Sequence, residues 1–400
     1  MKVPFSPPDI SELEINRVVE VLKSGWITTG PEVKEFERRI AEYIGVDKAV
    51  ALSSATASLE AALHILGIGE GDEVIVPAYT YTASASPVVH KGAKLVIIDS
   101  APETFEMDYD KVAEAINENT KAVIPVDLGG MICDYDRIFE IVESKKDLFK
   151  PANKLQAAIG RVAVISDGAH AFGSVKNGVK AGAIADFTFH AVKNLTTAEG
   201  GALAWRNIDG VDNDELYHEL QLYSLHGQSK DALSKNKAGA WEYDVVYPAY
   251  KCNMTNINAA IGIAQLERYE GLLARRRVLN ERYEAALEKL GIKVMPHYTE
   301  GMTSTGHLYL VRIPGASVDD RNAVIQDMAE REIACNVHYK PLPMMTAYKN
   351  LGFDIADYPN AYRQYENLIS LPIFSTMTDE QNEYVIENFV DILKKRGLIK

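Results

Sequence analysis

Short apolar runs alternate with amphipathic stretches through the first half of the chain. Residues 49–52, 73–77 and 95–99 have the length and the β-branched composition of buried strands. Between such runs, apolar residues recur every three or four positions, as in residues 57–66, which is the spacing of a helix. Strands separated by helices pair in parallel through right-handed crossovers. This half of the chain therefore predicts an α/β sheet covered by helices.

The same alternation continues along the chain. Strands are expected at residues 121–126 and 162–167, and helices at 83–91 and 134–144. Ligands of such sheets bind beyond the carboxyl ends of the strands. The loops that follow the strands are therefore where we look for functional residues.

The C-terminal part has a different pattern. A long helical stretch begins near residue 257 and reaches residue 290, with a break expected near Gly271. We predict that residues 1–255 form a large α/β domain with an N-terminal arm, and residues 256–400 a small α+β domain. The small domain is expected to hold strands at 307–313 and 334–339, and helices at 318–331, 359–368 and 379–395.

Composition excludes several classes of function. A formal net charge of −14 opposes nucleic acid as a main partner, although local amides and cations can still bind a small anion. Three widely spaced cysteines without a Cys-x-x-Cys pair indicate neither a disulfide framework nor a zinc site. The chain starts without a signal-peptide pattern and has no apolar run of 18 residues. We therefore expect a cytoplasmic protein with no membrane-spanning segment and no bound metal.

One junction of strand and helix has the features of a phosphate site. The apolar run 49–52 is followed by Ser53-Ser-Ala-Thr56 and at once by a helical pattern. A helix that begins there presents free backbone N–H groups and the positive end of its dipole. The alternative is that these hydroxyl residues only cap the helix. The junction alone leaves both interpretations open.

Two further loops follow predicted strands and carry candidate residues. Asp167 ends an almost wholly apolar strand, so its carboxylate needs a cationic partner or several donors, and a protonated ring nitrogen would serve. A role as a simple turn cap remains open. Tyr81 could cover a flat ring or only pack, and His170 could be an ordinary hydrogen-bonded loop histidine.

Lys193 lies at the centre of an unusual stretch. Thr188 precedes it, Gly200 and Gly201 follow it, and the residues around it carry little charge. Partial desolvation in such a setting lowers the pKa of a lysine and frees its amine as a nucleophile. A lone lysine of this kind is more often structural, so its assignment depends on the other motifs.

Taken together, the motifs resemble the DegT/DnrJ/StrS family of sugar aminotransferases, and the resemblance runs from Pro4 to about Asn388. The motifs are numerous and occur in the family's order. They are Ser24-Gly-Trp-Ile-Thr-Thr-Gly-Pro31, Ser53-Ser-Ala-Thr56, Val76-Pro-Ala-Tyr-Thr-Tyr-Thr-Ala83, Asp167-Gly-Ala-His-Ala-Phe-Gly173, Phe187-Thr-Phe-His-Ala-Val-Lys-Asn194, Tyr250-Lys-Cys-Asn-Met-Thr255 and Val337-His-Tyr-Lys-Pro-Leu342. The resemblance implies the fold of type I pyridoxal-phosphate enzymes, with a large, mostly parallel seven-stranded sheet and a small C-terminal α+β domain.

The resemblance also implies roles for individual residues. Lys193 matches the lysine that bonds to the aldehyde of pyridoxal 5′-phosphate, and Asp167 matches the carboxylate that keeps its ring nitrogen protonated. Asn253 matches an asparagine that reaches the phosphate of the neighbouring subunit's cofactor, which implies a homodimer with a shared active site. The remaining matches are Tyr81 and His170 beside the ring, Ser54, Ala55, Thr56 and Thr188 around the phosphate, and Thr28, Lys251, His338 and Tyr339 toward the nucleotide-sugar.

Two departures from the family pattern concern the site. Relatives commonly read Val-His-Leu-Tyr-Gly-Gln where this chain has Val126-Asp-Leu-Gly-Gly-Met131, and Thr188 replaces a commoner serine. The second change keeps a hydroxyl. The first could reshape the sugar pocket and leaves the exact substrate open.

The resemblance implies an aminotransferase that moves an amino group from glutamate or glutamine to a nucleotide-linked keto-sugar, as in polysaccharide biosynthesis. The segment at 337–343 looks closer to enzymes that act on a 4-keto group, such as a 4-keto-6-deoxy sugar. Alternatives are a 3-keto-sugar or keto-inositol substrate and a lyase on the same fold. Lys193 argues against the family's dehydratases, which carry histidine there, and we see no DNA-binding segment that a cofactor-sensing regulator would need.

Overall fold

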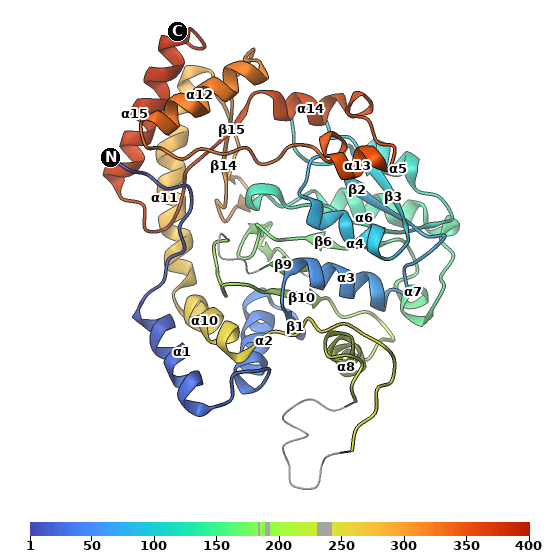
Figure 1. Ribbon diagram of the computed structural model, residues 1–400. Helices are drawn as coiled ribbons and strands as arrows, with labels where there is room; N and C mark the ends of the chain where they lie inside the picture. The colour runs from blue at the N-terminus through green and yellow to red at the C-terminus, as the bar shows by residue number, and fades with distance from the viewer. Residues whose placement is uncertain (183–184, 189–192, 230–241) are drawn as a thin grey trace.

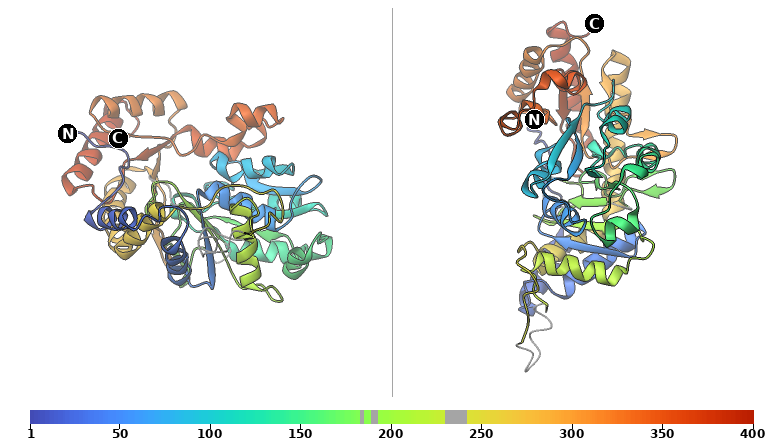
Figure 2. Two further views of the ribbon diagram at one scale, coloured as in Figure 1. Left: turned by 60° about the horizontal axis from the view of Figure 1, so that its bottom comes forward. Right: turned by 90° about the vertical axis from the view of Figure 1, so that its right-hand side faces the viewer.

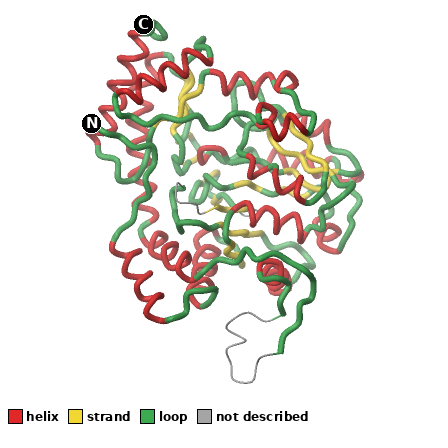
Figure 3. Tube along the Cα trace, viewed as in Figure 1, coloured by secondary structure: helices red, strands yellow, loops and turns green. Residues whose placement is uncertain are grey.

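Figure 1 shows the computed structural model of the chain, which describes residues 1–182, 185–188, 193–229 and 242–400. Strands lie near the centre and helices lie around them (Figure 3). Helices α12 (Val318–Glu330) and α15 (Asp379–Lys395) form a separate group near both chain ends (Figures 1 and 2). The chain therefore has a sheet-centred part and a second, smaller layered part.

The central sheet joins two four-stranded sheets, β3-β2-β4-β5 and β1-β10-β9-β6. Strands β5 and β6 follow one another across Ile165, so counting them as one gives a continuous sheet of seven strands. Neighbours run parallel except around β10, which is antiparallel to β9 and β1. The predicted mostly parallel seven-stranded sheet is confirmed. Its strands are β1 (Lys48–Leu52), β2 (Glu73–Pro77), β3 (Lys94–Ile98), β4 (Thr120–Val123), β5 (Ala163–Val164), β6 (Ser166–Asp167), β9 (Ala185–Thr188) and β10 (Gly201–Trp205).

The division of β5 from β6 differs from the single strand expected at 162–167. The amide of Ile165 still donates to the carbonyl of Val123 (3.0 Å), and the amide of Asp167 donates to that of Pro125 (2.9 Å). Strand β5 pairs with β4, whereas β6 pairs with β9 on its other side. The change of partner places Asp167 between the two halves of the sheet.

Helices bury both faces of the sheet. Val50, Leu52 and Leu203 pack toward α3 and α8, while the neighbouring residues Ala51 and Ala202 pack toward α2 and α10. Alternation with small residues on one face lets these helices approach closely. The helices around the sheet are α2 (Pro31–Ile44), α3 (Ala55–Ile65), α4 (Ser86–His90), α5 (Tyr109–Ala115), α6 (Tyr135–Ser144), α7 (Lys154–Ile159), α8 (Asn213–Ser224) and α10 (Asn256–Glu267).

The helix expected at 83–91 is shorter in the structure. A 3₁₀ turn at Thr82–Ser84 precedes α4, which begins only at Ser86. Pro87 lies in the first turn of α4, where its missing N–H costs no hydrogen bond. The turn leaves the side chain of Ser84 fully buried beneath the loop.

The smaller part contains a three-stranded antiparallel sheet in the order β11-β14-β15. The expected helix at 359–368 ends at Glu366, and the strand β15 that begins at Leu368 was not predicted. The elements here are β11 (Lys293–Val294), β14 (Tyr309–Arg312), β15 (Leu368–Leu371), α11 (Tyr269–Leu287), α13 (Thr346–Asn350) and α14 (Pro359–Glu366). A separate antiparallel ribbon comprises β7 (Val175–Lys176), β8 (Val179–Lys180), β12 (Tyr298–Thr299) and β13 (Met302–Thr303).

The strand expected at 334–339 is wrong. That segment makes an isolated bridge between Asn336 and Ser370 and otherwise follows an irregular path. The hydroxyl of Tyr79 donates to the carbonyl of His338 (3.1 Å) and accepts from the amide of Tyr339 (3.0 Å). These contacts with the large sheet turn the segment toward the cavity described below.

The long C-terminal helix breaks at Arg268, three residues before Gly271, near which the break was expected. The side chain of Arg268 donates to Glu14 (2.7 Å) in α1 (Glu12–Ser24) and to the side chain of Asp9 (2.8 Å). Gly271 lies in the first turn of α11, with open space where a Cβ would be. The break therefore follows contacts with the N-terminal arm, which the local sequence does not reveal.

Helix α10 packs against α2 and the large sheet, whereas Val3 of the N-terminal arm joins the apolar core of the smaller part. The division of the chain at residue 255 stays a prediction. Among the described helices, none combines the length and the apolar character needed to cross a membrane.

Candidate active site

A cavity of about 440 Å³ lies at the carboxyl ends of β2 and β6. The start of α3 and the segment after β9 complete its wall. It is lined by Ser54, Ala55, Thr56, Leu59, Thr80, Tyr81, Ala83, Val126, Asp167, Ala169, His170, Lys193, Glu199 and Tyr339. Many of the residues predicted from sequence therefore share one cavity.

The start of α3 presents backbone donors to this cavity. Ser54 caps the helix by accepting the amide of Ala57 (3.1 Å), while the amides of Ala55 and Thr56 belong to the first turn and have no partner within the helix. Strand β10 passes close beneath them, because a Cβ on Gly201 would lie 2.4 Å from the nitrogen of Ala55. The helix start suits an anion such as a phosphate.

Asp167 is buried at the floor of the cavity. Its Oδ2 accepts the hydroxyl of Ser84 (2.6 Å), and its Oδ1 accepts the amide of Ala169 (3.2 Å). Lys193 interacts electrostatically with this carboxylate. Donors on both oxygens and a nearby cation offset the cost of burying the charge.

Lys193 is half-buried where the chain resumes after β9. Burial lowers the pKa of its amine to about 8, and the charge of Asp167 opposes this shift. About a tenth of the amine is then neutral at pH 7, against well under a thousandth for an ordinary lysine. Lys193 thus has the character of an available nucleophile and base.

The protonation of His170 follows from its contacts. The amide of Gly129 donates to Nδ1 (3.0 Å), so the ring proton lies on Nε2, which is 3.2 Å from the hydroxyl of Tyr339. Burial and the nearby charge of Lys193 hold the pKa of His170 well below its usual range. The ring is therefore neutral and donates toward Tyr339.

A second histidine, which sequence reasoning missed, supports this arrangement. The rings of His307 and His170 lie 4.4 Å apart, and Nδ1 of His307 is 2.8 Å from the amide oxygen of Asn194. Asn194 also donates to the carbonyl of Thr305 (3.0 Å). Asn194 follows Lys193 directly, so His307 and Thr305 hold the segment that carries the lysine. The position of Asn194 next to Lys193 in the sequence was the signal that could have drawn attention to this contact.

Tyr81 lines the cavity with 56% of its surface exposed, and its ring lies 5.6 Å from that of Tyr339. An exposed aromatic at the mouth of a cavity can lie against a bound ring. The sequence left packing open as the alternative, but a side chain this exposed does little packing.

Several predicted residues lie outside this cavity. Thr28 is exposed, and Lys251 donates to the side chain of Asn253, which borders a different cavity beside α2 and α8. His338 stacks on Phe5 of the N-terminal arm, with 5.3 Å between the rings. The side chain of Thr188 lies outside the described part of the chain.

Sequence reasoning also missed two hydroxyls. Thr80 lines the cavity, and its hydroxyl lies 2.7 Å from that of Ser84, which contacts Asp167. Both residues belong to the polar loop after β2. The excess of hydroxyl residues in that loop was the signal that could have found them.

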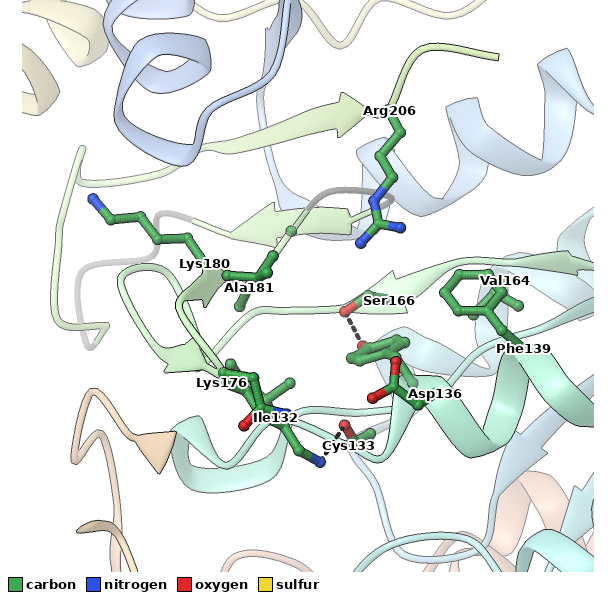
Figure 4. Close-up of a pocket in the computed structure, with 14 residues that line it drawn as sticks. Ile132, Cys133, Asp136, Phe139, Val164, Ser166, Lys176, Lys180, Ala181 and Arg206 are labelled. Carbon is green, nitrogen blue, oxygen red and sulfur yellow. Dashed lines mark hydrogen bonds between the residues drawn. The ribbon is translucent and has the colours of Figure 1, made fainter. Parts of the chain in front are cut away.

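The opposite face of the sheet carries a second buried carboxyl. Asp127 accepts the amide of Cys133 (3.0 Å), and the hydroxyls of Ser166 and Tyr135 lie 3.0 and 3.1 Å from its oxygens. Burial raises its pKa to about 7. Figure 4 shows the neighbouring cavity of about 140 Å³, into which Ser166 points.

The two faces thus differ in chemistry. The first cavity combines a free amine, a buried carboxylate, an exposed aromatic ring and a helix start with unused amides. This donor set fits a flat, phosphorylated aldehyde with a basic ring nitrogen, namely pyridoxal phosphate. The second face instead combines the uncharged donors around Asp127 with the charged side chains of Asp136, Lys176, Lys180 and Arg206 that line its cavity.

Comparison with known proteins supports this fit. A sequence model described as the DegT/DnrJ/EryC1/StrS aminotransferase family matches residues 8–390. The spore coat polysaccharide biosynthesis protein SpsC of Bacillus subtilis (strain 168) is 35% identical over 401 residues, covering 98% of this chain and 97% of that protein.

Solved structures agree closely with the fold. The protein described as a sugar aminotransferase, Spr1654 from Streptococcus pneumoniae, is 51% identical in its PLP-form, with a TM-score of 0.95 over 99% of both chains. Its PMP-form is 52% identical, with a TM-score of 0.96 over 98% of this chain and 100% of that one.

Proposed function

Because the chain belongs to the DegT/DnrJ/EryC1/StrS aminotransferase family and is a sugar aminotransferase that uses pyridoxal phosphate, we propose that its acceptor is a nucleotide-linked keto-sugar. The donor is glutamate or glutamine, and the sugar is a 4-keto-6-deoxy sugar. The observation that carries the proposal is the presence of Lys193 and Asp167 in one cavity with the start of α3.

When bound, pyridoxal phosphate supplies a carbonyl carbon for amines and an electron sink for a developing carbanion. Lys193 has the two properties that this chemistry asks of the protein. Its lowered pKa makes the neutral amine available to bond to the cofactor. Once displaced by the donor, the same amine takes the proton from the donor's α-carbon and returns it on the cofactor's side.

Asp167 holds a proton on the ring nitrogen. Its carboxylate keeps two donors and lies in a buried setting, where a charge acts strongly on a neighbouring cation. Tyr81, which is exposed and lines the cavity, would cover one face of the bound ring and exclude water from it. His170 stands beside the ring as a neutral donor through its contact with Tyr339.

The phosphate binds at the start of α3. Ser54, Ala55 and Thr56 would supply amides and a hydroxyl there. The resemblance assigns a second hydroxyl to Thr188, whose side chain lies outside the described part of the chain. These local donors attract an anion despite the acidic average charge of the chain.

The sugar substrate enters from the side of Tyr339. This residue lines the cavity, and the resemblance assigns His338, Lys251 and Thr28 to the nucleotide-sugar. Lys251 supplies a positive charge for a diphosphate. The polysaccharide role of SpsC supports a nucleotide-linked acceptor, since activated sugars are the substrates of such pathways. A cytoplasmic location follows from that role.

The enzyme acts as a homodimer in which Asn253 reaches the partner's cofactor. Helix α1 supports this, because it buries Glu14 against Gln265 and Arg268 and exposes apolar residues such as Ile15 and Leu22. A helix that turns its apolar side outward indicates a covered surface.

A mixing experiment tests the shared site. Lys193→Ala and Asn253→Ala subunits, each inactive alone, should regain activity when refolded together, because one site of the hybrid dimer is then intact. Lys193→Ala mixed with Asp167→Asn is the control and should stay inactive, since both residues belong to the same subunit's site. A mixture that gains no activity in the first case contradicts the shared site.

To test the substrate, the purified holoenzyme is first incubated with glutamate, which transfers its amino group to the bound cofactor. Keto-sugars linked to UDP, dTDP and GDP are added one at a time, and the return of the cofactor's visible absorbance is followed. Rapid return with a 4-keto-6-deoxy sugar is expected. Return only with a 3-keto-sugar or a keto-inositol would replace the proposed acceptor.

A further inference from the structure

The loop that follows β2 places two buried hydroxyls, those of Thr80 and Ser84, next to the carboxylate of Asp167. Thr80 and Ser84 are 1% and 0% exposed, so neither exchanges hydrogen bonds with bulk water. The hydroxyls lie 2.7 Å apart, and the hydroxyl of Ser84 lies 2.6 Å from Oδ2 of Asp167. The three side chains form one buried hydrogen-bonded line.

The directions of these hydrogen bonds follow from the groups themselves. An ionised carboxylate can only accept, so Ser84 donates its proton to Asp167. The oxygen of Ser84 then accepts, and Thr80 donates to it. This order stabilises the negative charge at the far end of the line, because each donor polarises the next.

We propose that Ser84 is a positioning residue for the amino-transfer reaction, and that with Thr80 it holds the Asp167 carboxylate aimed into the cavity. The inference rests on the proposed role of Asp167 toward the ring nitrogen. Ser84 itself lines no part of the cavity wall. It therefore acts through Asp167 and does not touch the substrate.

The surroundings of Asp167 explain why this support matters. In the part of the chain that the structure describes, Lys193 and Tyr339 are titratable groups that interact with it across the cavity. The amine of Lys193 is the group that bonds to the cofactor, so it is not a fixed charged partner of the carboxylate. Among the described residues, the hydrogen-bond donors to the carboxylate are the amide of Ala169 and the hydroxyl of Ser84.

The test is a pH titration of the cofactor's visible absorbance in the holoenzyme, without donor or sugar. In Ser84→Ala, the Asp167 carboxylate loses a donor and is held less firmly toward the ring nitrogen, so it stabilises the proton there less. The ring would then withdraw electron density less strongly from the nitrogen that links it to Lys193, so that nitrogen would hold its proton more tightly. The midpoint of the titration should therefore rise by about one pH unit. In turnover, kcat should fall roughly tenfold while KM for the donor changes less than about twofold.

Ser100→Ala is the matched control. Ser100 is equally buried, at the end of β3, and its hydroxyl has no hydrogen-bond partner among the described residues. Its variant should leave the midpoint and kcat unchanged. An equal shift in both variants would mean that any buried serine produces the effect, and the proposal would be wrong.

A second pair of variants decides the matter if Ser84→Ala does not fold. Thr80→Val keeps the shape but removes the hydroxyl, and should raise the midpoint by less than Ser84→Ala. Thr80→Ser restores the hydroxyl and should return the midpoint toward the wild-type value. Equal midpoints in the Val and Ser variants would show that the Thr80 hydroxyl does not act on Asp167 through Ser84, and the proposal would be wrong.

This result is separate from the proposed substrate. An enzyme that binds the cofactor but transfers no amino group to any keto-sugar would refute the proposed function and leave the titration interpretable. A titration midpoint in Ser84→Ala equal to that of wild type would refute the role of Ser84, but it would not contradict the proposed amino transfer.

Discussion

Asp127 and Asp167 are both buried aspartates, and they lie on opposite faces of the same pair of strand ends. The chain pairs Val126 with Asp167, and the amide of Asp127 donates to the carbonyl of Asp167 (3.1 Å). Asp167 faces the cavity that holds Lys193, whereas Asp127 faces the polar cluster of Ser166 and Tyr135. Their depth is similar, but their partners differ.

This difference shows that burial alone does not define a functional carboxylate. Asp127 has uncharged donors, and desolvation raises its pKa to about 7. Asp167 has uncharged donors as well, but it also has a cation in reach and a cavity large enough for a ligand. The account predicts that only the second carboxylate matters for the reaction.

The largest effect on turnover is expected from substitution of Lys193, the cation close to Asp167. Lys193→Ala removes the amine that bonds to the cofactor and moves the proton, so kcat should fall below detection. The visible absorbance of the lysine-bound cofactor should vanish, while the thermal unfolding midpoint changes little. Retained steady-state turnover would contradict the role of Lys193.

The two aspartates can be compared directly by the same substitution. Asp167→Asn should lower kcat by roughly 10² to 10³, because a neutral amide does not favour the protonated ring nitrogen. Asp127→Asn should leave kcat within about threefold of wild type, because this side chain acts on the other face of the sheet. Equal losses in the two variants would remove the distinction drawn here.

The pKa of Lys193 predicts a pH dependence for cofactor capture. The neutral amine increases as pH rises through about 8, so the rate at which the cofactor-free enzyme bonds pyridoxal phosphate should rise about tenfold per unit below pH 8 and level off above it. Stopped-flow absorbance measures this rate. A rate that still rises tenfold per unit between pH 9 and 10 would indicate an ordinary, exposed lysine.

Substitution of Asp127 is expected to have a smaller effect, on how the free energy of unfolding depends on pH. A carboxyl whose folded pKa is raised stabilises the fold most at low pH, and this contribution is lost as pH rises from about 4 through about 7. Glu37, whose pKa burial also raises to about 7, behaves alike. Buried histidines such as His170, whose pKa burial lowers, contribute a slope of the opposite sign, so the test is the difference between variants. Plotted against pH in this window, the free energy of unfolding of Asp127→Asn should have a slope more positive than that of wild type, by up to about 1.4 kcal/mol per pH unit.

Urea unfolding at a series of pH values between 4 and 8 measures this slope. Asp110→Asn is the control, because Asp110 is exposed and its variant should keep the wild-type slope. An unchanged slope in Asp127→Asn would mean that this carboxyl stays ionised in the folded protein.

Local pattern predicted the sheet because each strand is a short apolar run bounded by turns, and α15 was expected at the residues where it occurs. It failed where distant segments decide the structure. Segment 334–339 is irregular because Tyr79 holds it, and the helix break lies at Arg268 because the N-terminal arm binds there. Such contacts leave no trace in the periodicity of either segment.

The candidate site follows the same division. Lys193, Asp167 and the α3 start carry motifs that the sequence displays, and they share a cavity. The buried partners Ser84 and His307 were missed, because a serine or a histidine gains its role only from what the fold places beside it.

The central claim is that the lysine facing Asp167 is the one that holds the cofactor. Borohydride reduction of the holoenzyme, followed by digestion and mass spectrometry of the peptides, tests this most directly, since reduction fixes the cofactor to the lysine that carries it. The account predicts one modified peptide, with the pyridoxyl phosphate on Lys193. The same modification found on another lysine, with Lys193 unmodified, would contradict it.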